Sequence, residues 1–327
     1  MARALRAEEP DAQILLVGKR GGPEERLVPE AGFELETIRI QGLDRDAPWR
    51  NLALPFVLPA ALAAGRRILK RFRPDVVLGT GGYVMVPALR AARALGIPYV
   101  MLVMEPRGLA NRLFYKGAAA ACLSLPDRHG VVQAARVEVT GVPLRGEIRP
   151  ASPQAPARRL LVLGGSLGAR RINRAVWGGL DALLTRFETV VHVAGRQAEA
   201  DLPRYDRDRY RGLTFTDEMP RLLAEADLVV SRAGVGTISE ITACGLPSVV
   251  IPGTFAGAHQ EANAQVLVEE GAAVRIADDD LTSETLLRTL DSLQPEQLRS
   301  MAEAAASLGR PDAAQRVVRI LREVAAA

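Results

Sequence analysis

Three glycine-rich stretches of the chain each follow an apolar, strand-like run and precede a helix-like segment. They are Gly79–Val84 (GTGGYV), Gly164–Ala169 (GGSLGA) and Ser231–Thr237 (SRAGVGT). Glycines let the backbone approach a ligand closely, and the first turn of the following helix offers unpaired N–H groups with a partial positive charge. Such turns predict phosphate sites, although each one alone could also be a tight turn that binds nothing. Because no Lys-Ser/Thr pair follows Gly164–Ala169, this turn is not the phosphate loop of a nucleoside triphosphatase.

Polar side chains that suit a sugar nucleotide follow two apolar runs in the second half of the chain. Glu240 comes one helical turn after Gly236, where its carboxylate could accept hydrogen bonds from ribose hydroxyls or simply complement the helix dipole. His259, Gln260 and Asn263 open the helix-like segment that follows the apolar run ending at Ile251. Imidazole and amide groups suit sugar hydroxyls, although a lone histidine is more often structural. Together these side chains indicate a nucleotide site in the second half.

The elements that must position these residues alternate along the chain. Short runs rich in Val, Ile and Leu, bounded by Gly or Pro, alternate with segments of helical period, which predicts parallel sheets covered by helices on both faces. We expect an α/β fold of two Rossmann-like, doubly wound domains facing a cleft: residues 1–146, a Pro- and Ala-rich linker at 147–157, and residues 158–327. Three amphipathic helices, separated at Pro295 and Pro311, should end the second domain, with the last packing back across the linker.

The expected elements have the following bounds. Strands are predicted at Gln13–Gly18, Val76–Gly79, Tyr99–Val103, Ala119–Leu123, Val137–Thr140, Arg159–Leu163, Thr189–Val193, Leu213–Phe215, Leu228–Ser231, Ser248–Ile251 and Ala273–Ile276. Helices are predicted at Pro59–Phe72, Ala169–Leu184, Arg221–Ala226 and Gly236–Cys244.

Composition excludes several classes of protein. The 327 residues carry a net charge of +4, with +7 on residues 1–150 and −3 on the remainder, which predicts an anionic partner for the first half. Aromatic residues make up only 4%, too few for a surface that stacks nucleic-acid bases, so no nucleic-acid partner is expected. Cys122 and Cys244 are far apart in sequence, which excludes a disulfide scaffold and a zinc site built on paired cysteines.

The motifs agree in order and spacing with a known family. GTGGYV (Gly79–Val84), GGSLGA (Gly164–Ala169), SRAGVGTISEI (Ser231–Ile241) and HQEANA (His259–Ala264) closely resemble stretches of the MurG family of bacterial cell-wall glycosyltransferases. TGVPLR (Thr140–Arg145) resembles a fifth motif, with Val142 where the family usually has Asn. The resemblance runs with gaps over most of residues 12–280. It implies the two-domain GT-B fold and inverting transfer of GlcNAc from UDP-GlcNAc to the 4-hydroxyl of a lipid-linked muramyl-pentapeptide.

The resemblance also implies roles for individual residues. Arg145 and Ser166 would hold the donor diphosphate, and the backbone near Thr216 would read the uracil. Glu240 would bind the ribose, while His259 and Gln260 would bind the GlcNAc hydroxyls. The expected donor site is Arg145, Gly165, Ser166, Thr216, Gly234, Glu240, His259, Gln260 and Asn263, and the expected site for the lipid acceptor's diphosphate is Thr80, Gly81, Gly82 and Tyr83.

No cofactor or metal is expected, because an arginine and a helix start can neutralise a departing diphosphate. Asp278-Asp279-Asp280 resembles the metal-binding carboxylates of other glycosyltransferases, but its place before a helix favours a turn with caps. The family's His-Glu-Gln-Asn stretch is Met104-Glu105-Pro106-Arg107 here, which leaves Glu105 as the only carboxylate near the expected cleft and the catalytic base unassigned. Met1–Leu5 resembles the end of the family's first helix, so the family's first strand and His-containing glycine loop are expected to be missing.

A membrane-facing surface is expected in the first half. Apolar Leu54, Phe56 and Leu58 precede basic Arg66, Arg67 and Lys70, a pattern that suits a peripheral protein on the anionic cytoplasmic face of the cell membrane. A buried helix with a basic, solvated end is the alternative. For the function as a whole, the alternatives are a UDP-sugar binder without transferase activity, or another GT-B enzyme such as a UDP-GlcNAc epimerase or a different lipid glycosyltransferase.

Overall fold

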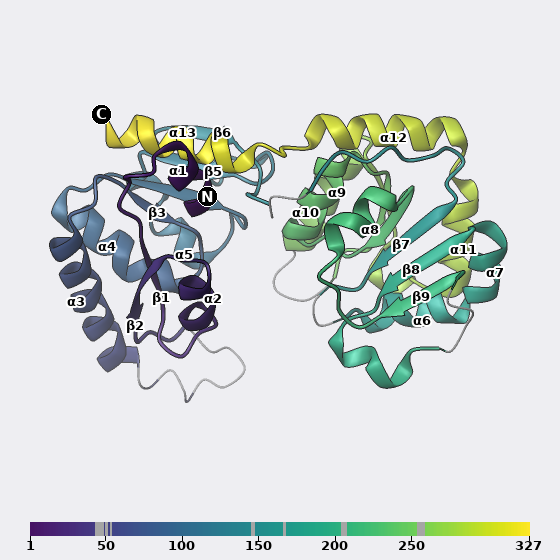
Figure 1. Ribbon diagram of the computed structural model, residues 1–327, viewed down its shortest axis with the longest axis horizontal. Coiled ribbons are helices and arrows are strands. Elements are labelled where there is room, and N and C mark those ends of the chain that lie inside the picture. Colours follow the sequence, from purple (N-terminus) through teal and green to yellow (C-terminus); the bar gives the residue numbers. More distant parts are fainter. Residues whose placement is uncertain are drawn as a thin grey trace. The chain divides into compact units, whose positions relative to one another are not determined.

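The chain folds into two compact units (Figure 1). The computed structural model describes residues 1–42, 49, 52, 54–144, 148–165, 168–203, 208–253 and 259–327. The first unit comprises Met1–Thr140 together with Asp312–Ala327, and the second comprises Gly141–Pro311. The sequence had assigned residues 158–327 to one domain, whereas the last 16 residues belong to the first unit.

The second unit is built on one six-stranded sheet in which all strands are parallel. The strands lie in the order β12-β11-β10-β7-β8-β9. Four of the strands, β7, β10, β11 and most of β8, are buried runs of Val and Leu, as expected for a parallel sheet covered on both faces. The strands are β7 (Arg159–Leu163), β8 (Thr189–Val193), β9 (Tyr210–Leu213), β10 (Leu228–Ser231), β11 (Ser248–Val250) and β12 (Ala273–Arg275).

Helices between and after these strands complete the second unit. They are α6 (Arg170–Gly178), α7 (Leu180–Arg186), α8 (Met219–Glu225), α9 (Val235–Cys244), α10 (His259–Glu269), α11 (Ser283–Ser292) and α12 (Pro295–Leu308), with 3₁₀ turns at Arg196–Asp201 and Asp278–Asp280. The single helix predicted over Ala169–Leu184 is in fact two, because the chain breaks at Gly178 and Gly179. The strand predicted at Leu213–Phe215 lies three residues earlier and ends at Leu213.

The first unit contains a four-stranded parallel sheet and a separate parallel pair. The sheet has the order β3-β4-β5-β6, and β1 pairs with β2, a strand that the sequence reading missed. The strands are β1 (Leu15–Lys19), β2 (Glu34–Ile38), β3 (Val77–Gly79), β4 (Tyr99–Val103), β5 (Ala120–Leu123) and β6 (Val137–Val139). The helices are α1 (Ala2–Glu8), α2 (Glu24–Glu30), α3 (Leu54–Phe72), α4 (Val86–Leu95), α5 (Leu109–Arg112) and α13 (Ala313–Ala325), with 3₁₀ turns at Tyr83–Met85 and Tyr115–Gly117.

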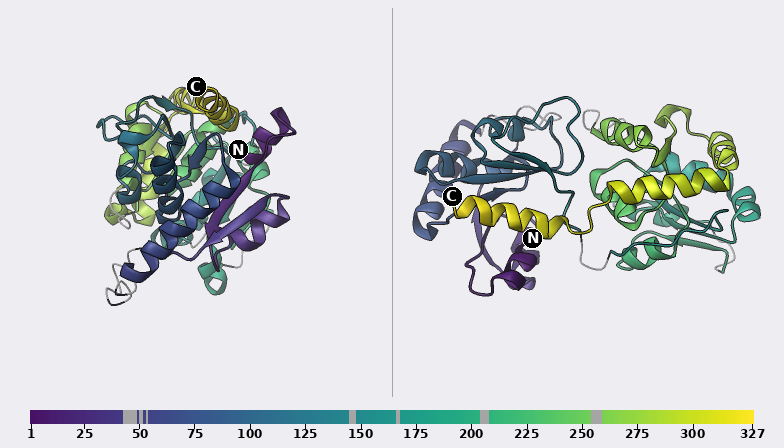
Figure 2. Two further views of the ribbon diagram at one scale, coloured as in Figure 1. Left: turned by 90° about the vertical axis from the view of Figure 1, so that its left-hand side faces the viewer. Right: turned by 90° about the horizontal axis from the view of Figure 1, so that it is seen from above.

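The C-terminal helix α13 explains why the end of the chain belongs to the first unit. Val317, Ile320 and Leu321 form one buried stripe at helical spacing. This stripe packs on the sheet face formed by β4 and β5, where Leu102 and Cys122 are buried in the same cluster (Figure 2). The chain therefore leaves the second unit after α12, which packs on α9, and ends with α13 in the first unit. That the last helix packs across the linker stays a prediction.

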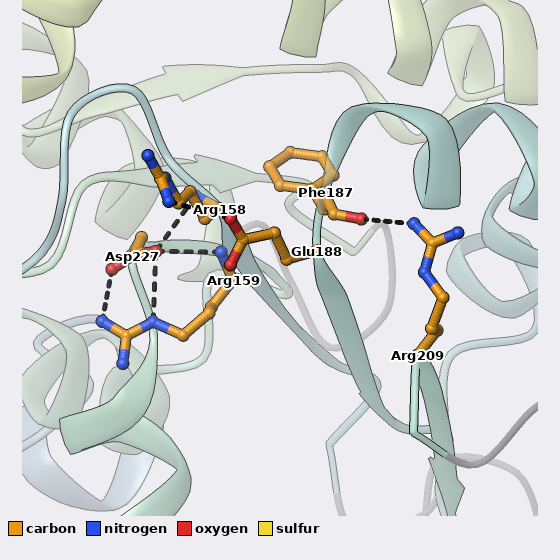
Figure 3. Close-up of polar contacts among 6 residues, drawn as sticks. All are labelled: Arg158, Arg159, Phe187, Glu188, Arg209 and Asp227. Carbon is orange, nitrogen blue, oxygen red and sulfur yellow. Dashed lines mark hydrogen bonds and ion pairs between the residues drawn. The ribbon is translucent and has the colours of Figure 1, made fainter.

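A buried carboxylate fixes the segment that the sequence identified as a linker. Asp227, fully buried just before β10, accepts hydrogen bonds from the backbone N–H groups of Gln154 (3.0 Å), Arg158 (3.0 Å) and Arg159 (2.9 Å). The Arg159 guanidinium completes the cluster with bonds of 2.6 and 3.2 Å (Figure 3). Burial alone would raise the pKa of the Asp227 carboxyl, but these five donors lower it below its ordinary value of 3.8. Asp227 thereby attaches the linker to the end of the sheet at which the two central strands, β7 and β10, begin.

Replacing Asp227 with alanine should lower the free energy of unfolding by about 3 kcal/mol, because it leaves a guanidinium and three backbone amides without their shared acceptor. Urea denaturation at pH 7 measures this. The stabilisation from the ionised carboxylate is complete above its ordinary pKa of 3.8 and is lost as the pH falls through the lower folded-state pKa.

The matched control is Glu188→Ala, which removes an exposed ion pair with Arg158 (2.9 Å) from the same edge of the unit. It should cost less than about 1 kcal/mol. Equal losses for the two variants would contradict the central place given to the buried carboxylate.

Candidate functional site

The structure brings two of the predicted glycine turns together in the second unit. In chain order the sheet has the pattern 3-2-1-4-5-6, and the connections reverse direction between β7 and β10, which are paired neighbours. The last residues of these strands, Leu163 and Ser231, are register partners, so the turns that follow them begin side by side. Ligands of doubly wound sheets bind at the carboxyl ends of the strands at such a switch point.

The turn after β7 lies against the end of β8. The Gly164 N–H donates to the carbonyl of Val193 (2.9 Å), and the Gly168 N–H donates to that of Gly165 (3.1 Å). Gly165 and Gly168 have φ angles of 77° and 92°, a region that favours glycine. A Cβ on Gly168 would lie 2.5 Å from the backbone oxygen of Ala194, so glycine is required there by space as well as by conformation. Predicted residue Ser166 lies outside the described residues.

The third polar motif joins the turn after β10. Asn263 on α10 donates from Nδ2 to the carbonyl of Ala233 in that turn (3.0 Å). Gln260 accepts a hydrogen bond at Oε1 from the Gly253 N–H (2.8 Å), which connects the start of α10 to the segment after β11. His259 is partly exposed at the first position of α10.

Two further predicted donor residues, Gly234 and Glu240, lie at the N-cap and in the second turn of α9 and are also partly exposed. The motifs carried by α9 and α10 thus converge at one edge of the sheet.

One other predicted residue, Thr216, lies apart from this convergence. Thr216 follows β9, the edge strand, and its hydroxyl accepts a hydrogen bond from the Glu218 N–H (2.9 Å) just before α8. Its side chain therefore shapes the turn, and the prediction that backbone near Thr216 reads the uracil stays a prediction. Arg145 lies outside the described residues.

The aspartate triplet forms a turn, but it does not cap the next helix. Thr282 caps α11, accepting a hydrogen bond at Oγ1 from the Thr285 N–H (3.1 Å). Asp278 is buried and pairs instead with Arg232 and with Arg171, whose Nε lies 3.3 Å from its carboxylate.

This ion cluster joins α6 to the turn that follows β10. Arg171 on α6 also reaches Asp279 (3.0 Å), and Arg232 donates to the carbonyl of Ile251 (3.2 Å). Across the part of the chain that the structure describes, no three His, Cys, Asp or Glu residues are grouped so that they could hold a metal ion. The sequence predicted no role for either arginine, although Arg171 closely follows one glycine motif and Arg232 lies within another.

The glycine turn of the first unit follows β3. Gly81 and Gly82 have φ angles of 95° and 71°, and Thr80, Gly82 and Tyr83 are exposed. The predicted residues are therefore open to a ligand.

Asn111, which the sequence reading did not identify, lies beneath this turn. It is buried and donates from Nδ2 to the carbonyl of Glu105 (2.9 Å). A Cβ on Gly81 would lie 3.9 Å from Asn111 Oδ1, an atom that has no hydrogen-bond partner among the described residues. Glu105, the carboxylate considered for catalysis, is exposed just after β4.

The predicted membrane surface lies on α3, which begins at Leu54 rather than at Pro59. Phe56 is 81% exposed and Leu58 41%, whereas Leu54 is partly buried. The helix face that starts at Phe56 continues through exposed Arg67 and Lys70, with exposed Arg66 beside them. Phe56 therefore shares one outward face with Arg67 and Lys70, whereas Leu54 and Leu58, two residues to either side of it, point to the other side of the helix. No helix among the described residues is both long and apolar enough to cross a membrane.

Comparisons with known proteins agree with this architecture. Residues 1–119 match the N-terminal domain of glycosyltransferase family 28, and residues 159–317 match its C-terminal domain. The chain is 38% identical to the UDP-N-acetylglucosamine–N-acetylmuramyl-(pentapeptide) pyrophosphoryl-undecaprenol N-acetylglucosamine transferase of Desulfitobacterium hafniense, covering 99% of this chain and 94% of that protein. It is 40% identical to the Salinibacter ruber protein of the same name, covering 98% of this chain and 90% of that one.

Solved structures give the same result. The crystal structure of Acinetobacter baumannii MurG superposes with a TM-score of 0.76 at 28% identity, covering 98% of this chain and 95% of that one. The kitacinnamycin glycosyltransferase superposes at 0.71 with 21% identity, which shows a shared fold only. Two parallel α/β units with glycine turns at the strand ends define a GT-B glycosyltransferase. Within that class, the chain belongs to glycosyltransferase family 28 and, in it, to the MurG family.

The close approach of the β7 turn to β8 can be tested with two glycine variants. Gly168→Ala should be more destabilising than Gly165→Ala. Both require an alanine in the left-handed region, which costs roughly 1–2 kcal/mol, but only the Gly168 variant also drives a methyl group against a backbone oxygen. Thermal unfolding of the two variants measures the difference. Equal melting temperatures would show that the turn is free to move away from Ala194.

Proposed function

We propose that this chain transfers GlcNAc from UDP-GlcNAc to the 4-hydroxyl of undecaprenyl-pyrophosphoryl-MurNAc-pentapeptide. Its relatives in Desulfitobacterium hafniense and Salinibacter ruber are named as N-acetylglucosamine transferases for this donor and this lipid-linked acceptor. The observation that carries this proposal is the pairing of β7 with β10, which starts two glycine turns side by side at the switch point of the sheet. The polar helix α10 is hydrogen-bonded to the second of these turns. A sugar nucleotide needs just such neighbouring diphosphate, ribose and sugar contacts.

In the proposed donor complex, the second unit holds UDP-GlcNAc. The diphosphate lies against Gly165 and the start of α6, with Ser166 and Arg145 as further ligands. Glu240 accepts hydrogen bonds from the ribose hydroxyls. Gly234 allows the backbone to approach the nucleotide, and the backbone near Thr216 contacts the uracil. The GlcNAc hydroxyls bond to His259, Gln260 and Asn263.

The proposed reaction is a single in-line displacement. The 4-hydroxyl oxygen of the muramyl sugar attacks the anomeric carbon of GlcNAc as the bond from that carbon to the β-phosphate oxygen breaks, so the anomeric configuration inverts. UDP leaves with the bonding electron pair, and the hydroxyl proton passes to a base. Glu105 is the carboxylate we consider for that role. The lipid acceptor's diphosphate lies against the turn formed by Thr80, Gly81, Gly82 and Tyr83.

We propose that departure of UDP requires no metal ion. Backbone N–H groups aimed at a developing charge stabilise it without reorganisation at the moment of reaction. A turn of backbone amides at the start of α6, together with the guanidinium of Arg145, supplies this stabilisation here.

Release of UDP from UDP-GlcNAc in the presence of the lipid-linked muramyl acceptor tests the reaction directly. Glu240→Ala should weaken UDP-GlcNAc binding at least tenfold, about 1.4 kcal/mol, because the ribose hydroxyls lose a charged acceptor. Calorimetry measures the affinity.

The control is Glu225→Ala on α8, which removes an exposed carboxylate paired with Arg221 (2.8 Å) and should leave the affinity unchanged. Binding of UDP-GlcNAc without transfer would identify a sugar-nucleotide binder instead of a transferase. Unaltered affinity in Glu240→Ala would refute the ribose contact.

We further propose that the outward face of α3 binds the anionic cytoplasmic leaflet, where the lipid acceptor is anchored. Apolar groups such as Phe56 would enter the headgroup region, while Arg66, Arg67 and Lys70 attract acidic lipids. Each basic residue near such a surface contributes about 1 kcal/mol.

Replacing Arg66, Arg67 and Lys70 with glutamine should therefore weaken binding to phosphatidylglycerol-containing vesicles about a hundredfold at low salt. Sedimentation measures the bound fraction. Glutamine at exposed Arg174, Arg288 and Arg299 of the second unit makes the same change in net charge and should have little effect. Equal losses in the two triple variants would favour general charge attraction over a defined surface.

A further inference from the structure

A chain of four hydrogen bonds runs through the interior of the second unit. Trp177 on α6 donates from Nε1 to the Tyr210 hydroxyl (3.0 Å), which bonds to Nδ1 of His192 on β8 (3.3 Å). His192 Nε2 bonds to Oδ1 of Asn173 (3.0 Å), and Asn173 Nδ2 donates to the backbone oxygen of Ala194 (3.0 Å). Tyr210, His192 and Asn173 are all buried, so these groups have exchanged water for one another.

Only one arrangement of protons satisfies this chain. Because the amide nitrogen of Asn173 donates to a carbonyl, its Oδ1 must accept, and His192 must carry its proton on Nε2. Nδ1 of His192 then accepts the proton of the Tyr210 hydroxyl, whose oxygen accepts from Trp177. His192 remains neutral at physiological pH, because burial lowers its pKa to about 3. Each donor in the series therefore points toward the next residue, and the last acceptor is the backbone oxygen of Ala194.

The last acceptor in this series of hydrogen bonds is the backbone oxygen of Ala194, which lies directly against the glycine turn that follows β7. A Cβ on Gly164 would lie 3.0 Å from this oxygen, and one on Gly168 only 2.5 Å from it. The main chain of Asn173 makes the ordinary first-turn hydrogen bond of α6, from its N–H to the carbonyl of Ala169 at the N-cap (2.9 Å), so this residue lies one turn from the end of the glycine turn. One residue of α6 is thus bonded both to the end of the turn and to the peptide behind it.

We propose that Asn173 is a positioning residue for donor binding: it fixes the Ala194 carbonyl and the start of α6 so that the glycine turn presents its backbone N–H groups to the diphosphate. This inference rests on the proposed function, because it assigns the turn to the diphosphate of a uridine nucleotide. Asn173 itself is buried and acts through the backbone that it holds.

A network that only stabilises the core would satisfy the same buried polar atoms. The two roles predict different effects on nucleotide binding when different members of the series are substituted. Tyr210 and Trp177 lie at the far end of the chain, separated from the turn by His192 and Asn173. Loss of the Tyr210 hydroxyl leaves the bond between Asn173 and Ala194 intact, whereas loss of the Asn173 amide removes it.

The test compares Asn173→Ala with Tyr210→Phe by calorimetry with UDP and with uridine. Asn173→Ala should weaken UDP binding about tenfold and change uridine binding less than twofold, because only UDP carries the diphosphate. Tyr210→Phe should lower the melting temperature yet leave UDP affinity within twofold of wild type. If Asn173→Ala weakens UDP and uridine equally, or if Tyr210→Phe loses as much UDP affinity, the residue has only a structural role and the proposal fails.

A second measurement needs no nucleotide. Backbone amides of Gly164, Gly165, Gly168 and Ala169 should exchange hydrogen at least tenfold faster in Asn173→Ala than in Tyr210→Phe. If Asn173→Ala does not fold, Asn173→Ser replaces it in both experiments. Equal exchange in the two variants overturns the positioning role. Failure of the wild-type chain to bind UDP would instead refute the proposed function, and the exchange comparison would still decide whether Asn173 holds the turn.

Discussion

The parallel pairing of β7 with β10 is the constraint on which the rest of the second unit depends. It places the ends of two strands, and therefore the start of two glycine turns, at one point of the sheet. The opposite ends of the same two strands are held by the buried Asp227, whose carboxylate also binds the linker backbone. A single strand pair is thus fixed by charge at one end and left open to a ligand at the other. The buried ion cluster and the proposed ligand site therefore lie at opposite ends of the same strand pair.

Two arginines near the open end of the strand pair are already neutralised by a carboxylate. Arg171 follows one glycine turn and Arg232 lies at the start of the other, yet each is paired with the buried carboxylate of Asp278. These ion pairs hold α6 and the turn after β10 together, and the carboxylate neutralises the arginine charge. Helix starts and turn N–H groups have no counter-charge of this kind, and they need no side chain that a departing anion would have to reorient. The aspartate triplet, which resembles a metal site in sequence, serves here to neutralise arginines.

The sequence predicted the fold well where burial dominates local structure. The mostly apolar runs Tyr99–Val103, Arg159–Leu163, Thr189–Val193 and Leu228–Ser231 coincide with β4, β7, β8 and β10, because a strand buried on both faces is predominantly apolar. It missed β2 (Glu34–Ile38), in which Glu34, Glu36 and Thr37 leave only two apolar residues and only Ile38 is buried. It assigned α13 to the second domain, because an amphipathic pattern shows that a helix has an apolar face but not which sheet covers that face.

The residues that position the site were harder to predict than the residues that form it. Gly164, Gly168 and Asn263 can be identified from their motifs and from their place after a strand. Few residue types other than glycine allow a close backbone approach, so such motifs are easy to recognise. Asn173 and His192 lie in ordinary helix and strand positions, and nothing in a single sequence shows that two buried polar groups 19 residues apart are partners. Their role can be recognised only when all partners in the series of hydrogen bonds are known from the structure. A buried amide without partners would destabilise the fold, so its partners show what it holds in place. A glycine turn can approach a ligand only if the peptide behind it stays in place, so the side chains that hold that peptide belong to the site as much as the turn does.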